Sequence, residues 1–198
     1  NHKSIKDKVS FSMIAGSDNT SEELLKEFGN FRILRSAIIY GANGSGKSNF
    51  INALAFMCEL VNSSINYQPG QEVFQACHKL STMETPSEYS IQFVRNDIRY
   101  AYGFSVKKNV ISDEYLYYFP KGRQVKIFER KEMELKPGDR YKNAFDVSIS
   151  ILKNNRLFLS CAANYSNVKE VEEAFLFFNK DIVVYNPEIN NWTEYSIE

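Results

Sequence analysis

The chain has 198 residues, of which 43% are hydrophobic and 24% are charged, and this length allows one good core or two small ones. Lysine and arginine together number 24, as do aspartate and glutamate, so the net charge is zero and no global basic field argues for nucleic acid. No apolar run approaches the roughly 20 residues of a membrane-spanning helix, and the three cysteines lack metal-binding spacing, so we expect a cytoplasmic protein with reduced thiols and no membrane contact.

The N-terminal region predicts one strand and one short helix. Residues 9–13 alternate apolar and polar side chains, which is the period of a half-buried strand. Residues 22–28 predict a short helix that ends at Gly29. Because the first residue is an asparagine and lies in what reads as the middle of an element, we expect that the chain is part of a larger protein.

Residues 41–48 read GANGSGKS, which is a complete GxxxxGK[ST] phosphate-binding loop. The apolar run at residues 36–40 predicts a buried strand before the loop, and helical spacing at residues 49–61 predicts a helix after it. Backbone N–H groups in such a loop converge on a phosphate, and glycines permit backbone angles that a Cβ would forbid. We therefore predict that the chain binds a nucleoside triphosphate.

The predicted site consists of this loop and the start of the helix. Lys47 can reach the β- and γ-phosphates, so it is the residue to which we assign a catalytic role. Ser48 offers its hydroxyl to Mg²⁺, which usually keeps several waters and takes few protein ligands. The predicted nucleotide-binding residues of the loop are Gly41, Ala42, Asn43, Gly44, Ser45, Gly46, Lys47, Ser48 and Asn49.

Residues 88–130 change from helical spacing to strand spacing and predict a β-rich lobe. Asn and Asp in the intervening turns tolerate left-handed backbone angles, which favours hairpins and hence an antiparallel meander. The predicted strands cover residues 89–94, 98–106, 111–119 and 124–128. A simple nucleotide kinase or small GTPase would continue with alternating strands and helices, so the lobe counts against both classes.

Beyond the lobe, the pattern predicts helices at residues 148–155 and 168–179 and a strand at residues 182–185. Hydrolysis of a nucleoside triphosphate needs an acidic residue at the end of an apolar strand to organise the Mg²⁺ shell. The last strand is followed instead by Asn186 and Pro187, and Glu188 comes two residues too late. We therefore recognise no catalytic acid in this chain.

The order of these features resembles the N-terminal half of a bacterial ABC-type ATPase of the AAA-15/AAA-21 group. The resemblance rests on the SAIIYGAN run, the GANGSGKSN loop, the FINALAFM helix, the meander and the LFLSCAAN segment. Residues 1–4 also resemble the tail of the family's opening pattern, and residues 115–122 with 127–130 resemble its lobe hairpin. The group is related to the RecF, SMC and OLD ATPases, and it has members in restriction, abortive-infection, Septu and retron-associated phage defence.

The resemblance implies an α/β P-loop NTPase of ABC-ATPase type with an inserted antiparallel β-meander lobe. It also implies that residues 1–198 are the incomplete, N-terminal part of one ATPase head. In this division residues 1–70 are the P-loop core, residues 71–147 the β-rich lobe, and residues 148–198 the return to the core. The signature Ser-Gly segment, the acidic strand end and the switch His would belong to a C-terminal half.

The resemblance adds two residues to the expected site. Lys3 corresponds to a basic residue that approaches the nucleotide in the family. Asn164 stands where relatives often carry a glutamine that completes Mg²⁺ and water coordination, and an asparagine is one methylene shorter. We therefore include Lys3 among the nucleotide-binding residues and Asn164 with Ser48 among the metal ligands.

The implied function is a nucleotide-driven switch with ATP and Mg²⁺ as cofactors. Two ATP-bound heads would form a homodimer that hydrolysis releases, and the switch would act on a nuclease or other effector in anti-phage defence. Contact with DNA or RNA is left open by the neutral net charge. The alternatives are a P-loop kinase for small molecules or nucleotides, and a nucleotide-binding module without turnover.

Overall fold

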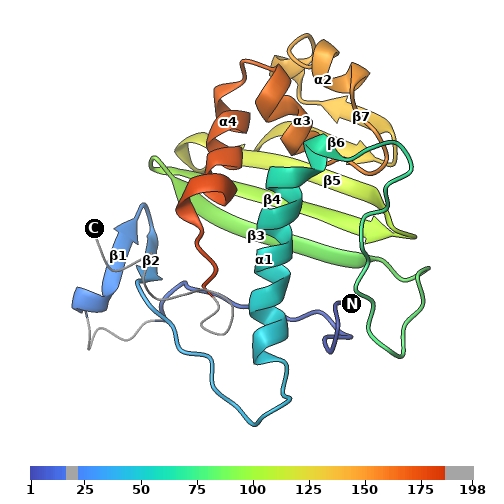
Figure 1. Cartoon of the computed structure of the whole chain (residues 1–198). Coiled ribbons are helices and arrows are strands. Elements are labelled where there is room, and N and C mark those ends of the chain that lie inside the picture. The colour runs from blue at the N-terminus through green and yellow to red at the C-terminus, as the bar shows by residue number, and fades with distance from the viewer. Residues whose placement is uncertain (17–21, 186–198) are drawn as a thin grey trace, which may run out of the picture.

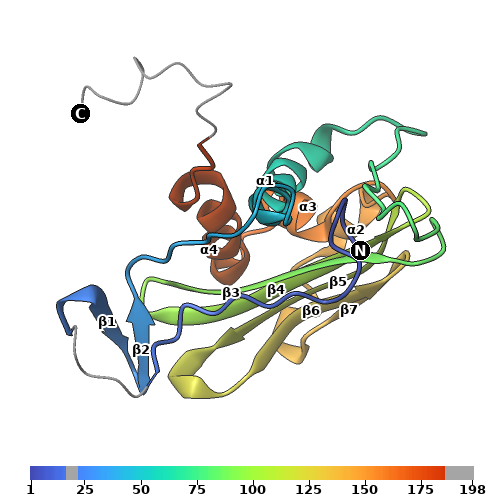
Figure 2. The same cartoon turned by 90° about the horizontal axis from the view of Figure 1, so that it is seen from below.

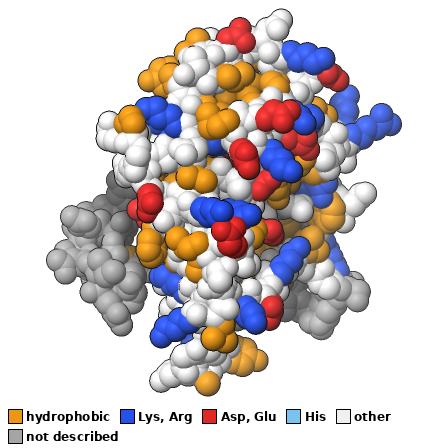
Figure 3. All heavy atoms as spheres, turned by 90° about the vertical axis from the view of Figure 1, so that its right-hand side faces the viewer, with side chains coloured by type: hydrophobic (Ala, Val, Ile, Leu, Met, Phe, Trp, Pro, Cys, Tyr) orange, Lys and Arg blue, Asp and Glu red, His pale blue; other side chains and the backbone are white. Residues whose placement is uncertain are grey.

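The computed structural model describes residues 1–16 and 22–185. A five-stranded sheet lies under a layer of helices, and a two-stranded hairpin projects at one side (Figure 1). Within these described residues, no helix has the length and apolar character needed to cross a bilayer. Basic and acidic side chains are interspersed over the face drawn in Figure 3, in keeping with the zero net charge.

The large sheet is an antiparallel meander whose strands pair in chain order. Its strands are β3 (Ser87–Arg95), β4 (Ile98–Lys107), β5 (Val110–Phe119), β6 (Val125–Lys131) and β7 (Glu134–Pro137). The turn residues Asn96, Asp97, Lys108 and Asn109 have positive φ angles of 49° to 59°, which close tight hairpins. The four strands predicted from the sequence are confirmed, whereas β7 was missed because its four residues are too few to display a period.

Helices cover one face of this sheet, as the view from below shows for α1, α3 and α4 (Figure 2). The helices are α1 (Lys47–Ser63), α2 (Asp146–Ser150), α3 (Phe158–Tyr165) and α4 (Lys169–Leu176), which continues into a π-helical turn (Phe177–Asp181). Short 3-10 turns occupy Glu22–Leu24, Ser64–Asn66, Pro120–Gly122 and Asp139–Tyr141. The helix predicted after the loop and the one predicted over residues 168–179 are confirmed, and α2 is shorter than the helix predicted there.

One apolar core joins the helices to the sheet. Met57, Leu60 and Val61 of α1 are buried at helical spacing, which places them on the face that packs against the strands. The same core contains side chains from all three regions into which the sequence was divided. The boundaries between those regions therefore stay a prediction.

A buried carboxylate fastens the sheet to α3. Glu114 of β5 accepts hydrogen bonds from the backbone N–H groups of Phe158 at 2.5 Å and Leu159 at 2.9 Å. These are the first two N–H groups of α3, where free donors and the helix dipole favour a negative charge. Glu114 also accepts from the Tyr102 hydroxyl at 3.0 Å and from Arg130 at 3.4 Å, and the side chains of the ion pair have no exposed surface.

The projecting hairpin consists of β1 (Leu25–Phe28) and β2 (Phe31–Leu34), which pair antiparallel. Gly29 lies in the turn between them with a φ angle of 55°. The helix predicted over residues 22–28 is therefore wrong, because the glycine closes a hairpin turn instead of ending a helix.

Three predicted strands are absent: residues 9–13, which alternate apolar and polar side chains, and the short apolar runs at residues 36–40 and 182–185. Apolar patterns describe side chains, whereas a strand also needs a neighbour that pairs with its backbone over several residues. Within residues 1–16 and 22–185, the first segment reaches β2 only at its end, where Met13 O accepts from Leu34 N at 2.7 Å and Ile14 forms an isolated bridge with Ile33, and the other two segments belong to neither sheet. As a result Ile38 and Tyr40 are 87% and 90% exposed instead of buried.

The architecture is mixed α/β, and every strand pair formed by the described residues is antiparallel. The predicted β-meander is confirmed. The ABC-ATPase type and the incompleteness of the head stay predictions, and Asn186, Pro187 and Glu188 lie outside the described residues.

Candidate functional site

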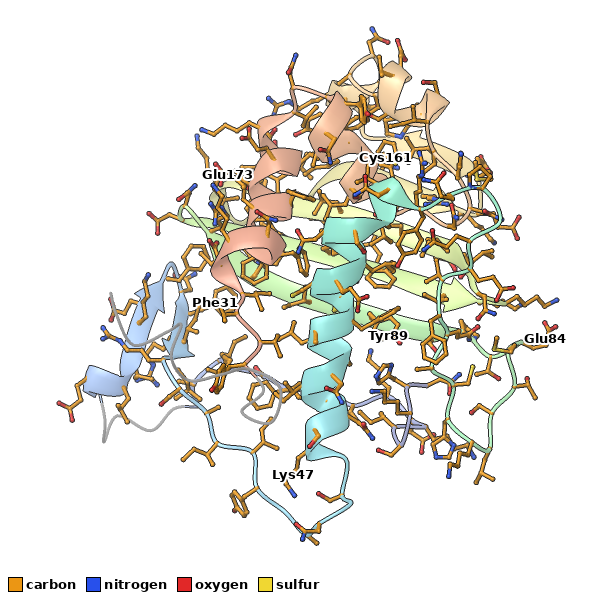
Figure 4. The ribbon with its side chains drawn as sticks, in the orientation of Figure 1. Phe31, Lys47, Glu84, Tyr89, Cys161 and Glu173 are labelled. Carbon is orange, nitrogen blue, oxygen red and sulfur yellow. The ribbon has the colours of Figure 1, made fainter. Side chains whose placement is uncertain are left out.

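The glycine-rich loop leads directly into α1, whose first residue, Lys47, lies at the end of the helix remote from α3 (Figure 4). Gly44 and Gly46 have φ angles of 80° and 98°, which side chains with a Cβ rarely adopt. Gly46 is the N-cap residue and offers no side chain to cap the helix. The helix therefore begins without a capping side chain, and its first backbone N–H groups are left without a side-chain acceptor.

The uncovered donors are the backbone N–H groups of Gly46, Lys47, Ser48 and Asn49. None of them has an acceptor in the part of the chain that the structure describes, and the first bond of the helix runs from Phe50 N to Gly46 O at 3.0 Å. Residues 44–49 line a cavity of about 130 Å³. Free N–H groups at the positive end of a helix dipole form a binding site for an anion such as a phosphate.

Lys47 adds a positive charge to this cavity. Its Nζ donates hydrogen bonds to the carbonyl oxygens of Gly41 at 2.8 Å and Ala42 at 2.9 Å. An ammonium group has three donors, so one of them remains for a further acceptor. The side chain therefore lies folded over the loop, where a phosphate oxygen would compete with the two carbonyls.

The tip of the loop is a tight turn. Ser45 N donates to Ala42 O at 3.2 Å, and a Cβ on Gly41 would lie 3.0 Å from Ser45 Oγ, which is closer than most side chains allow. Asn43 is exposed at the tip. Of the predicted loop residues, Gly44 to Asn49 line the cavity, whereas Gly41, Ala42 and Asn43 do not, and their role in binding stays a prediction.

Ser48 is exposed on the first turn of α1 and lines the same cavity. A single hydroxyl there suits Mg²⁺, which is held by few protein ligands together with waters and phosphates. Within the described residues, no group of three or more His, Cys, Asp or Glu side chains is placed to hold a metal ion.

Asn164 lies on α3, near the opposite end of α1. Leu157, just before α3, donates its N–H to Ser64 Oγ at the C-terminal end of α1 at 3.1 Å, and Asn164 itself donates to Ser160 O at 2.8 Å. The 17 residues of α1 span about 25 Å between its two ends. The structure therefore does not bring Asn164 next to Ser48, and its role as a metal ligand stays a prediction.

The N-terminal residues form a turn that touches the loop. His2 and Ile5 pair through two backbone hydrogen bonds of 2.7 and 2.8 Å, and Lys3 between them is exposed and has a φ angle of 50°. Ser4 Oγ accepts a hydrogen bond from Asn49 Nδ2 at 2.7 Å. The contact of Ser4 was not predicted, and its signal in the sequence was its place in the opening pattern of residues 1–4, beside Lys3.

His2 anchors this turn in the core. Its Nδ1 lies 2.7 Å from the Tyr89 hydroxyl, and its ring centroid lies 6.3 Å from that of Phe56 on α1. Burial, helped by the positive charges of Lys3 and the N-terminal amino group, lowers the pKa of His2 to about 4. The imidazole is therefore neutral at physiological pH.

A second cavity, of about 270 Å³, adjoins the first and shares Ser45, Gly46 and Lys47 with it. The rest of its lining is mostly apolar and consists of Ile5, Val9, Ser10, Phe11, Ile39, Tyr40 and Phe50. These residues come from the N-terminal turn, from two segments that the sequence predicted as strands and from α1. The loop therefore has an apolar surface on one side.

A family model described as "AAA domain, putative AbiEii toxin, Type IV TA system" matches residues 36–147, more than half of the chain. The matched region contains the run before the loop, the loop itself, α1 and all five strands of the large sheet. No curated protein and no solved structure shows a significant match to the chain.

Proposed function

Because this chain belongs to the AAA-21 family of AAA domains, we propose that it binds Mg²⁺-ATP at residues 41–49 and serves as the nucleotide-dependent switch of a larger ATPase. The observation that carries the proposal is the start of α1. Four free backbone N–H groups, two glycines with positive φ angles and the Lys47 ammonium surround one cavity.

The loop of residues 41–49 suits a triphosphate for structural reasons that do not depend on the family. A carboxylate or another capping side chain would satisfy the donors at the start of an ordinary helix, and none of the residues that the structure describes supplies one. A residue with a Cβ at Gly44 or Gly46 would be strained by the positive φ angle. Glycine at these positions leaves the backbone of the loop without side chains, so a phosphate can approach its N–H groups closely. Within this site Lys47 would bind the β- and γ-phosphate oxygens.

Ser48 would hold Mg²⁺ through its hydroxyl. Mg²⁺ held there would supply positive charge that offsets the negative charge of the phosphates. Lys3 lies in the turn beside the loop, and we include its ammonium among the groups that attract the nucleotide. Asn164 would reach the metal only after α3 or α1 changes position.

Hydrolysis needs an acidic residue and a group that orients water, in addition to the cradle. We propose that these groups come from another region or another protomer. In that arrangement two heads close over ATP and separate after hydrolysis, and their movement drives an effector such as a nuclease or toxin in anti-phage defence. The family description, which names a toxin of a type IV toxin–antitoxin system, supports an effector role of this kind.

Nucleotide binding is tested by calorimetric titration of the chain with Mg²⁺-ATP, with Lys47→Ala as the test variant and Lys131→Ala as a matched control. Lys131 is an exposed lysine on β6, outside both cavities. We expect Lys47→Ala to lose at least about tenfold in affinity, since hydrogen bonds to charged groups are each worth about 1.5 to 3 kcal/mol, and Lys131→Ala to bind like the wild type. Equal binding by Lys47→Ala, or no binding by the wild type, would contradict the proposal.

The switch itself is tested by recording hydrolysis and oligomeric state in ATP, ADP and buffer. We expect binding without efficient turnover by this chain alone. Efficient hydrolysis by the chain alone would mean that residues 1–198 contain a complete catalytic set and would overturn the proposal that other regions supply the acid.

A further inference from the structure

The turn of residues 2–5 connects the nucleotide loop to the β-rich lobe. On the loop side, Ser4 Oγ accepts the hydrogen bond from Asn49 Nδ2 at 2.7 Å. The same oxygen is the atom that a Cβ on Gly46 would meet at 3.2 Å. Ser4 therefore lies against both the N-cap residue and the first turn of α1, where the free backbone donors are found.

On the lobe side, the turn is held by several independent contacts. Lys3 N donates to Ala76 O at 2.7 Å, and His2 pairs with the Tyr89 hydroxyl on β3. Asn1 accepts from His78 N at 2.8 Å and donates to Thr85 O at 3.0 Å. These contacts fix the backbone around Ser4, so its hydroxyl has a defined position relative to the lobe.

The chemistry of Ser4 suits a positioning role. A serine hydroxyl can accept one hydrogen bond and donate another at the same time. Its oxygen accepts from Asn49, and its hydrogen has no acceptor in the described part of the chain. Ser4 is also exposed, and its Oγ contacts Asn49 and lies next to Gly46, two residues that line the cavity.

We propose that Ser4 is a positioning residue of the nucleotide site, which orients Asn49 and the first turn of α1 from the β-rich lobe. This inference rests on the proposed function, because the group that it positions is the cradle for the phosphates. The N-terminal turn then contributes the Ser4 hydroxyl as well as the Lys3 charge, and through Ser4 the lobe holds the loop in position. A substitution at Ser4 should therefore change nucleotide affinity without unfolding the domain.

The test compares Mg²⁺-ATP affinity and thermal stability in Ser4→Ala, Ser4→Thr, Asn49→Ala and the double variant Ser4→Ala/Asn49→Ala. Ser63→Ala is the matched control, because its hydroxyl also makes one hydrogen bond, of 2.6 Å, but at the opposite end of α1. Ser4→Thr keeps the hydroxyl, and the φ angle of Ser4 is not positive, so threonine fits the backbone.

We expect Ser4→Ala to weaken Mg²⁺-ATP binding about three- to tenfold, which is the loss of one hydrogen bond, with an unchanged melting temperature. Ser4→Thr should restore the affinity, and Ser63→Ala should bind like the wild type. Because Ser4 and Asn49 act through one contact, the double variant should lose no more than the larger single loss.

Wild-type affinity in Ser4→Ala, or additive losses in the double variant, would overturn the inference and leave the proposed function intact. Reduced affinity in Ser4→Thr equal to that in Ser4→Ala would also overturn it, because the hydroxyl would then not be the cause. If the wild type fails to bind Mg²⁺-ATP, the proposed function and this inference are both overturned.

Discussion

Replacing Glu114 with glutamine should destabilise the domain strongly. The carboxylate receives donors from two backbone N–H groups of α3, from the Tyr102 hydroxyl and from Arg130, all in a site without solvent. A glutamine offers one acceptor oxygen and turns an NH₂ group toward the remaining donors. It also leaves the Arg130 guanidinium buried without its counter-charge.

Removing one partner of a buried ion pair costs about 3 to 5 kcal/mol, a large part of the roughly 5 to 15 kcal/mol by which a domain is stable. For a chain of this length we expect the melting temperature to fall by about 6 to 20 °C. The assay is thermal and urea unfolding followed by circular dichroism. Glu129→Gln is the matched control, because Glu129 lies on the adjacent strand, is 43% exposed and should change stability by less than about 1 kcal/mol.

Glu114 and α3 lie near the end of α1 that is remote from the loop, so Mg²⁺-ATP affinity measured well below the melting temperature should stay unchanged. A free energy of unfolding within about 1 kcal/mol of the wild type would refute the conclusion that Glu114 fastens α3 to the sheet.

Two further predictions concern the loop and its anchor. Gly46→Ala should reduce Mg²⁺-ATP affinity at least about tenfold, because alanine is strained at a φ angle of 98° and its Cβ would lie too close to Ser4 Oγ. Gly16→Ala is the control, because a Cβ on Gly16 meets no atom within 4 Å, and it should bind normally in the same titration. Equal affinities of the two variants would contradict this prediction. Since the pKa of His2 is about 4 when folded and 6.5 when exposed, the unfolded chain binds more protons between these pH values, so stability should fall as pH decreases from 6.5 to 4, by at most about 3 kcal/mol. Urea unfolding across this range should show that His2→Phe removes that part of the slope, and an identical slope in both proteins would contradict the assignment to His2.

The features that the sequence predicted correctly are those with a local cause. The glycine-rich loop leads into a helix as its sequence predicted, and the meander follows from strand alternation with Asn and Asp at turns of positive φ. Each of these signals lies within about ten residues of the element that it specifies. The helix α1 was likewise visible from the spacing of its apolar residues.

The features that were missed depend on contacts between distant residues. Residues 36–40 form an apolar run like that of a buried strand, yet a strand exists only where a second one pairs with it. Ser4 and Asn49 are 45 positions apart, and nothing in their types reveals that they meet. The role of Glu114 likewise depends on Phe158 and Leu159, which reach it only after α3 packs on the sheet.

The central claim is that the loop before α1 binds a nucleoside triphosphate, and titration of isotopically labelled protein with Mg²⁺-ATP, followed by backbone amide resonances, tests it most directly. The account predicts that the largest shifts occur at the four free N–H groups of Gly46, Lys47, Ser48 and Asn49 and disappear in Lys47→Ala. No shifts, or shifts confined to residues outside the loop and its two cavities, would contradict it.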